Sequence, residues 1–344
     1  MLVIDGSRGE GGGQILRTSV ALSAVTGSQL RVINIRANRS NPGLRAQHVS
    51  AINAVAELCN ARVKTVDTGS KEIGFYPGKI KGGNFNVDIG TAGSITLLLQ
   101  AFMIPAAFAD KRVRIRIRGG TDVRWSPPID YLRHVTLPVL EKFNYRAEIE
   151  LGRRGYYPKG GGRVKATIHP IEELKPVEMV DWGDIKAAGG VAHAHSDLEK
   201  ALVARRQAKA SRSLVYKKLA NMQYQGDIEI KQEYDKTLSY GSGITLWVET
   251  DNSIIGADSL GARDKIAESV GSEAAVSLIR EIDSGASLDR YMADQIVPYL
   301  ALAGGKVRVS QVTGHTRTNV DIVNKFGFNV KVKGDIIEAA RPQT

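Results

Sequence analysis

One short glycine-rich stretch carries the residue types best suited to chemistry. Residues 9–17 read GEGGGQILR, in which four glycines in five positions surround the carboxylate of Glu10. Directly afterwards, Ile15, Leu16 and Val20 recur at helical spacing. A loop that opens onto a helix N-terminus offers free N–H groups and a favourable dipole to an anion such as phosphate. We therefore predict an anion site at this loop.

Glu10 has two interpretations within such a loop. It is either a residue that simply begins a helix or a ligand for a divalent metal bound to phosphate, and the residues alone favour the first somewhat. Two common nucleotide fingerprints do not fit. The P-loop pattern G-x-x-x-x-G-K-[ST] is absent, and Gln14 stands where G-x-G-x-x-G needs its last glycine.

Composition predicts a globular protein with a substantial core. The chain has 344 residues, of which 42% are hydrophobic. It contains no apolar run of membrane-spanning length and no N-terminal signal segment, so we expect a soluble, cytoplasmic protein. The one cysteine, Cys59, lies in an apolar stretch and is expected in the core.

The charge balance favours a polyanionic partner. Lysine and arginine number 47 against 36 acidic residues, giving a net charge of +11. RNA or DNA leads the candidates, and the alternative is a mesh of surface ion pairs. Arginine alternates from Arg112 to Arg118, which predicts that one face of a strand carries all four of these side chains.

The chain also repeats itself. Residues 31–49 and 112–135 both read as an alternating strand, a loop with proline, and a helix, and Arg36 corresponds to Arg118, 82 positions later. A third copy, residues 306–332, follows only after a much longer interval, which indicates an inserted module.

Each copy reads as helices packed on one face of a small sheet. The predicted fold is therefore α+β, with three repeated split-βαβ units and a smaller inserted α/β domain. We expect residues 1–180 to hold repeats one and two of a large domain, 181–270 the inserted domain, and 271–344 repeat three.

His315 stands out among six histidines because it lies in the predicted strand-to-helix loop of the third copy, in TGHTRTN. It corresponds to the loops holding Arg36 and Arg39 in copy one and Asp122 and Arg124 in copy two. Pseudo-symmetric packing would bring these loops together. By itself, a lone loop histidine is more often ordinary than catalytic, and no local pattern supports a hydrolase triad. His193 and His195 share a predicted strand face but lack a nearby third ligand for zinc.

The chain resembles the RNA 3'-terminal phosphate cyclase family along essentially its whole length. The motifs that carry the resemblance are GEGGGQILR at Gly9, IRANRSNPGLRAQH at Ile35, IGTAGS and LLLQ between Ile89 and Gln100, GGTD and PP between Gly119 and Pro128, YYPKGGG at Tyr156, YMADQ at Tyr291 and GHTRTN at Gly314. The resemblance implies three repeats like the C-terminal domain of translation initiation factor 3 and a smaller inserted domain. It also implies ATP-dependent conversion of an RNA 3'-phosphate to a 2',3'-cyclic phosphate.

The resemblance further implies roles for individual residues. His315 would become adenylylated, and Glu10 would bind Mg²⁺ or Mn²⁺ against the phosphates of ATP. Tyr291 would stack on one face of the adenine, and Pro127 or Pro128 would lie against the other face of the adenine. Four residues would lie near the phosphates or the RNA end: Arg17, Arg36, Arg39 and Gln47. The remaining nucleotide-binding positions would be Gln100, Met292, Ala293, Asp294 and Gln295.

Two alternatives stay open. Non-catalytic members of the family act in ribosomal RNA processing and lack the nucleophilic histidine, so the presence of His315 disfavours that role. Enolpyruvyl transferases share a similar repeated unit and bind small phosphorylated acids without forming a covalent AMP. Labelling with α-labelled ATP separates both from a cyclase.

Overall fold

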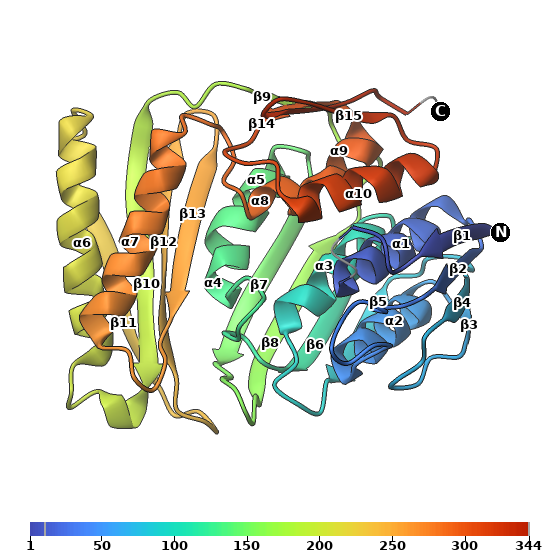
Figure 1. Ribbon diagram of the computed structural model, residues 1–344, viewed down its shortest axis with the longest axis horizontal. Helices are drawn as coiled ribbons and strands as arrows, with labels where there is room; N and C mark the ends of the chain where they lie inside the picture. The colour runs from blue at the N-terminus through green and yellow to red at the C-terminus, as the bar shows by residue number, and fades with distance from the viewer. Residues whose placement is uncertain (10–11, 343–344) are drawn as a thin grey trace.

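The computed structural model describes residues 1–9 and 12–342 and shows an α+β protein with four small mixed sheets of four strands each (Figure 1). The first sheet contains β1 (Leu2–Asp5), β2 (Leu30–Ile33), β3 (Arg62–Lys64) and β4 (Ile73–Tyr76). The second contains β5 (Gly83–Asp88), β6 (Val113–Gly119), β7 (Arg146–Arg153) and β8 (Gly162–His169). The third contains β9 (Val177–Met179), β14 (Gly305–Arg308), β15 (Val330–Lys333) and β16 (Ile336–Ala339). The fourth contains β10 (Ile185–His195), β11 (Ile228–Asp235), β12 (Ser242–Thr250) and β13 (Ile254–Leu260).

The first three sheets share one pairing pattern. In each, the first strand along the chain runs parallel to the second, and the fourth lies between the second and third, antiparallel to both. The third sheet obtains its first strand, β9, from far upstream in the sequence. In the sequence, all four strands of the fourth sheet therefore lie between β9 and β14.

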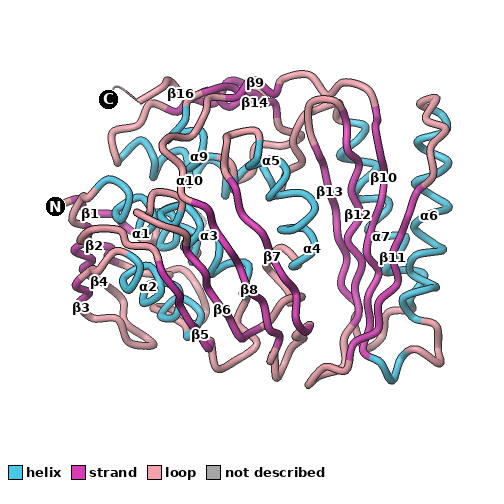
Figure 2. Tube along the Cα trace, turned by 180° about the vertical axis from the view of Figure 1, so that it is seen from behind, coloured by secondary structure: helices cyan, strands magenta, loops and turns pink. Residues whose placement is uncertain are grey.

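The helices of the first three sheets pack against one another between those sheets, as Figure 2 shows. They are α1 (Gly13–Thr26), α2 (Ala46–Leu58), α3 (Ile95–Ala106), α4 (Ile129–Tyr131), α5 (Leu137–Glu141), α8 (Met292–Gln295), α9 (Val297–Ala303) and α10 (Gly314–Lys325). A π-helical turn, Leu132–Thr136, joins α4 to α5. Pro138 follows this turn and has no N–H for a regular helical hydrogen bond.

The fourth sheet has its own helices and its own core. A 3₁₀ turn, Ser196–Leu198, precedes α6 (Val203–Asn221), and α6 and α7 (Ala267–Asp283) pack together against this sheet (Figure 1). Their buried apolar residues form a cluster separate from the main core, running from Ala188 to Ile282. The boundary expected at residue 270 thus falls inside α7, whose Val270, Ala274 and Leu278 all belong to this second cluster.

Several expectations about local structure are confirmed. Three of the four alternating arginines, Arg114, Arg116 and Arg118, lie on β6, where they are exposed and the intervening residues are buried, whereas Arg112 precedes the strand. Cys59 is fully buried, and burial raises the pKa of its thiol to about 11. Within the described part of the chain, no helix is both long and apolar enough to cross a membrane.

Candidate active site

Two helix N-termini converge at the centre of the molecule. Helix α1 follows the glycine-rich loop, and α10 carries His315. The amide nitrogen of Gln14 donates both to the backbone carbonyl oxygen of His315, at 3.1 Å, and to Oδ2 of Asp294, at 3.0 Å. One turn further on, Thr18 donates to Oδ1 of Asn319 at 2.8 Å. The two helices therefore direct their free N–H groups and positive dipole ends toward one region.

Between these helices runs a narrow cleft that gathers several predicted residues. Arg17, Gln100, Asp294 and Gln295 all line it, together with the π-helical turn. Its volume is about 30 Å³. Small-molecule sites usually offer at least about 300 Å³, so a nucleotide bound here requires the cleft to widen.

His315 lies in the first turn of α10, which corrects the expectation that it belongs to the preceding loop. The helix begins early because the side chain of Thr313 accepts a hydrogen bond from the backbone N–H of Thr316 at 3.1 Å. Thr316 completes a capping box by interacting with the backbone N–H of Thr313. The cap fixes the backbone on either side of His315.

Two glycines of this segment, Gly9 and Gly13, are packed too tightly for a larger residue. A Cβ on Gly9 would lie 2.2 Å from Oγ1 of Thr318, and the φ of Gly9 is +55°. A Cβ on Gly13 would lie 2.2 Å from Nε2 of His48. Glycine is thus required for close packing against α10 and α2. Glu10, the predicted metal ligand, lies outside the described residues.

The site is electropositive. Burial lowers the pKa of His48 to about 3, with Arg17, Arg36 and Arg45 adding to the effect, so this imidazole is neutral at pH 7. Its Nδ1 accepts the backbone N–H of Arg45 at 3.0 Å. Burial also lowers the pKa of Arg17 to about 10, opposed by the charge of Asp294, which leaves the guanidinium protonated. The positive charge that lowers the pKa of His48 equally favours a phosphate.

The other predicted residues of the first copy take different places. Arg36 donates to the carbonyl oxygens of Asn41, at 2.6 Å, and Gly43, at 3.0 Å, and so holds its own loop together. The guanidinium of Arg39 lies next to Gly12 in the glycine-rich loop. Gln47 lies elsewhere, where its Oε1 accepts the backbone N–H of Ser94 at 3.2 Å.

The YMADQ segment is anchored by Asp289, a residue that the sequence analysis did not single out. Oδ1 of Asp289 accepts the backbone N–H groups of Tyr291 and Met292, each at 2.9 Å. Tyr291 is 47% exposed, whereas Met292 and Ala293 are buried in the core. Only the backbone of those two residues is left to face a ligand. Pro127 is half-buried, and its carbonyl oxygen accepts the hydroxyl of Thr96 at 2.7 Å.

Sequence reasoning missed two members of the central site, Gln14 and Asn319. Asn319 donates to the backbone carbonyl oxygen of Asp294 at 2.7 Å, so both amide side chains tie the YMADQ segment to a helix. Their places inside GEGGGQILR and GHTRTN were the available signal.

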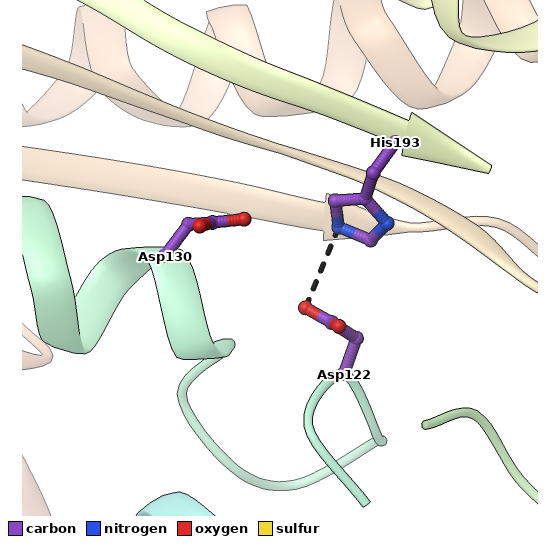
Figure 3. Close-up of side chains that lie close together, drawn as sticks. All are labelled: Asp122, Asp130 and His193. Carbon is purple, nitrogen blue, oxygen red and sulfur yellow. Dashed lines mark ion pairs between the residues drawn. The ribbon is translucent and has the colours of Figure 1, made fainter. Parts of the chain in front are cut away.

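A second, buried charge cluster joins the fourth sheet to the rest of the molecule. In the described part of the chain, three possible metal ligands come together: Asp122, Asp130 and His193 (Figure 3). Nε2 of His193 lies 3.4 Å from Oδ1 of Asp122. The guanidinium of Arg154 already supplies the balancing charge, with Nη2 2.7 Å from Oδ2 of Asp130 and Nη1 3.4 Å from Oδ2 of Asp122. The cluster therefore fits a structural ion network better than a metal centre.

The same arginine reaches across to the fourth sheet. Arg154 lies 2.5 Å from Oε2 of Glu233 and 3.6 Å from Oδ2 of Asp235, both on β11. Burial, with Arg154 nearby, lowers the pKa of His193 to about 3, and its Nδ1 shares a 2.7 Å hydrogen bond with the hydroxyl of Tyr156. The partners of Arg154 come from segments far apart in the sequence, so no local sequence pattern predicts this ion network.

Comparison with known proteins gives one consistent result. Residues 8–333 match the family model described as "RNA 3'-terminal phosphate cyclase". A protein of that name from Thermococcus onnurineus is 51% identical over 99% of this chain and 98% of the relative. Proteins of the same name from Pyrococcus furiosus and Methanopyrus kandleri are each 48% identical, over 98% and 97% of this chain and 97% and 96% of their own lengths.

Proposed function

The chain belongs to the RNA 3'-terminal phosphate cyclase family, and from this premise we propose that it converts the 3'-terminal phosphate of an RNA to a 2',3'-cyclic phosphate, using ATP. The observation that carries the proposal is the convergence of α1 and α10, which joins the glycine-rich loop to His315 through Gln14. Arg17, Gln100 and Asp294 line the adjoining cleft. The N-termini of two helices, together with a buried guanidinium, suit the binding of a triphosphate.

The reaction needs three displacements at phosphorus. An imidazole nitrogen of His315 attacks the α-phosphorus of ATP, and pyrophosphate leaves. An oxygen of the RNA 3'-phosphate then attacks the same phosphorus, which breaks the N–P bond and frees the imidazole. Finally, the ribose 2'-hydroxyl loses its proton and attacks the terminal phosphorus of the RNA, and AMP leaves. The last step is intramolecular, so proximity supplies much of its rate.

The surrounding residues take roles that follow from their positions. The capped first turn of α10 holds the imidazole, and Arg17 neutralises phosphate charge. In this proposal Gln100, Asp294, Gln295 and the backbone of Met292 and Ala293 bind the nucleotide, and Tyr291 stacks on adenine opposite Pro127. Arg39 lies beside the glycine-rich loop, where it would meet phosphate, while Arg36 fixes its own loop and Gln47 marks the approach of the RNA.

Glu10 is the proposed ligand for Mg²⁺ or Mn²⁺. It stands between Gly9, which packs against α10, and Gly12, which lies beside Arg39. A carboxylate is an oxygen ligand of the kind that hard divalent cations prefer. When bound, the cation would neutralise phosphate charge that the cationic side chains leave unbalanced.

The architecture supports three repeats and one insert. The shared pairing pattern of the first three sheets supports units like the C-terminal domain of translation initiation factor 3. Packing of α7 against the fourth sheet favours an inserted domain that extends to about residue 283 rather than 270. We place the protein in the cytoplasm, where both ATP and RNA are available.

A substrate analogue tests the order of steps. An RNA that ends in a 2'-deoxy-3'-phosphate nucleotide should accept AMP but not cyclise, so the adenylylated RNA accumulates and migrates more slowly on a gel. The ribose-ended control should give the cyclic end, which resists phosphatase. Failure of both RNAs to receive AMP from a labelled protein contradicts the proposal, and an unlabelled protein favours a non-catalytic member of the family.

A further inference from the structure

Three unusually exposed aromatic side chains border one open groove. Trp125 is 94% exposed, Tyr157 76% and Tyr240 64%. The groove has a volume of about 700 Å³ and runs between the loop after β6, the Tyr156–Tyr157 segment and the ends of β12 and β13. Aromatic rings normally contribute most when buried, so this concentration in one groove indicates a surface that is covered by something other than this chain.

Trp125 has a strained backbone conformation, and the ring of Tyr240 is held by specific contacts. The φ of Trp125 is +68°, a left-handed conformation that is strained for a bulky residue. The hydroxyl of Tyr240 donates to Oδ2 of Asp197 at 2.7 Å, and its ring lies 4.5 Å from that of His195. The groove is therefore built to present ring faces rather than to hide them.

Charge and position indicate what covers the groove. Arg124 lines it and is exposed, and Lys159 is exposed two residues beyond Tyr157. Among the described residues that line the groove, the one carboxylate, Asp122, is buried and paired with Arg154. Aromatic faces beside exposed cationic side chains suit a single strand of nucleic acid, whose bases stack on rings while its phosphates meet arginine or lysine.

The groove and the candidate active site are linked through neighbouring residues of α2. Gln47 lines it and is bound by the backbone of Ser94, which lines it as well. The neighbouring residue of α2, His48, packs against Gly13 at the start of α1. A strand that placed its end at the phosphate site would have this groove as its path outward.

We infer that the groove binds the unpaired nucleotides immediately before the RNA 3'-phosphate, with their bases stacked on Trp125 and Tyr157. The inference rests on the proposed function, because it takes the RNA end to lie at His315. The groove lies at the junction between the inserted domain, which contributes Tyr240, and the loop after β6, which contributes Trp125. RNA binding would give this junction a function. A duplex end would not serve, because paired bases do not expose their faces.

Fluorescence tests this inference without any chemistry. Trp125 is exposed, whereas Trp182 and Trp247 are half-buried. Single-stranded RNA with a 3'-phosphate, added without ATP, should quench the wild-type emission, and Trp125→Phe should abolish most of that change. Quenching that is unaltered in Trp125→Phe overturns the proposal.

Affinity measurements supply the second arm. Trp125→Ala and Tyr157→Ala should each weaken binding of single-stranded RNA by at least about fivefold, the lower end of a base-stacking contact. Trp125→Phe keeps a ring and should lose less. The matched control is Tyr216→Ala, which removes an aromatic of 57% exposure from α6, away from the groove, and should leave binding unchanged.

Abasic RNA locates the stacked bases. Removing the bases next to the 3' end should weaken binding to the wild type more than binding to Trp125→Ala, because one of the two stacking rings is already gone in the variant. Equal penalties in both proteins contradict stacking, as does wild-type affinity in the alanine variants. Self-labelling with ATP should remain normal in all variants. Loss of labelling in the wild type would instead refute the proposed function while leaving the binding result intact.

Discussion

Gly13 is a position at which one added methyl group should disturb the site through packing alone, because its φ is not positive. Its Cβ would lie 2.2 Å from Nε2 of His48, a ring that is buried and held by Arg45. Overpacking of this kind costs about 1–3 kcal/mol. We expect Gly13→Ala to lower the free energy of unfolding by that amount, as measured by urea denaturation.

Gly12→Ala is its matched control. Among the described residues, a Cβ there meets only the end of the Arg39 side chain, at 3.4 Å, and the φ of Gly12 is −94°, which alanine adopts readily. Its loss of stability should stay below about 1 kcal/mol. If the two variants have equal free energies of unfolding, the tight contact with His48 does not contribute to stability.

Individual residues differ in how far the sequence could foretell them. His315, Arg17 and Asp294 were marked by motifs, and the structure brings them to one region. Arg154 was not marked, because its partners lie 24 to 81 positions away along the chain and no local pattern relates them. Met292 and Ala293 were marked as part of a run, but burial restricts them to backbone contacts.

The first turn of α10 positions the side chain of His315, the proposed nucleophile. Thr313 caps the helix two residues before His315. Loss of an N-cap costs about 1 kcal/mol and frays the first turn. Thr313→Ala should therefore lower stability by that amount and slow self-labelling with ATP, whereas Thr313→Ser, which keeps the hydroxyl, should behave like the wild type. Full labelling speed in Thr313→Ala would mean that the cap does not position the imidazole.

Regular elements followed from the sequence where one face is buried. The alternation along β6 predicted both the strand and its exposed arginines, because side chains on a strand alternate between faces. Helix α1 followed from its apolar spacing. The π-helical turn before Pro138 did not follow from that spacing, and the early start of α10 depends on a cap rather than on hydrophobic periodicity.

The junction between the fourth sheet and the remainder of the molecule should be sensitive to acid. His193 is buried and neutral there, with a pKa of about 3 against about 6.5 in an unfolded chain. The unfolded state binds the extra proton between those values, so the stabilisation is present above pH 6.5 and is lost as the pH falls toward 3. One histidine should cost about 1 kcal/mol between pH 7.5 and 5.5.

Urea denaturation at those two pH values measures this contribution. His193→Gln removes the titrating group, so its loss of stability between pH 7.5 and 5.5 should be smaller than that of the wild type by about 1 kcal/mol. An unchanged pH dependence would show that His193 titrates normally in the fold. The comparison concerns only the pH dependence, so a general destabilisation by the substitution does not affect it.

The whole architecture converges on one claim, that His315 carries AMP. The most direct measurement is incubation with α-labelled ATP, followed by denaturing electrophoresis. Wild-type protein should retain label, and His315→Asn should retain none while unfolding at the same temperature. His169→Asn, a histidine on β8 far from this chemistry in sequence and structure, should label normally. Wild-type labelling of His315→Asn would contradict the account.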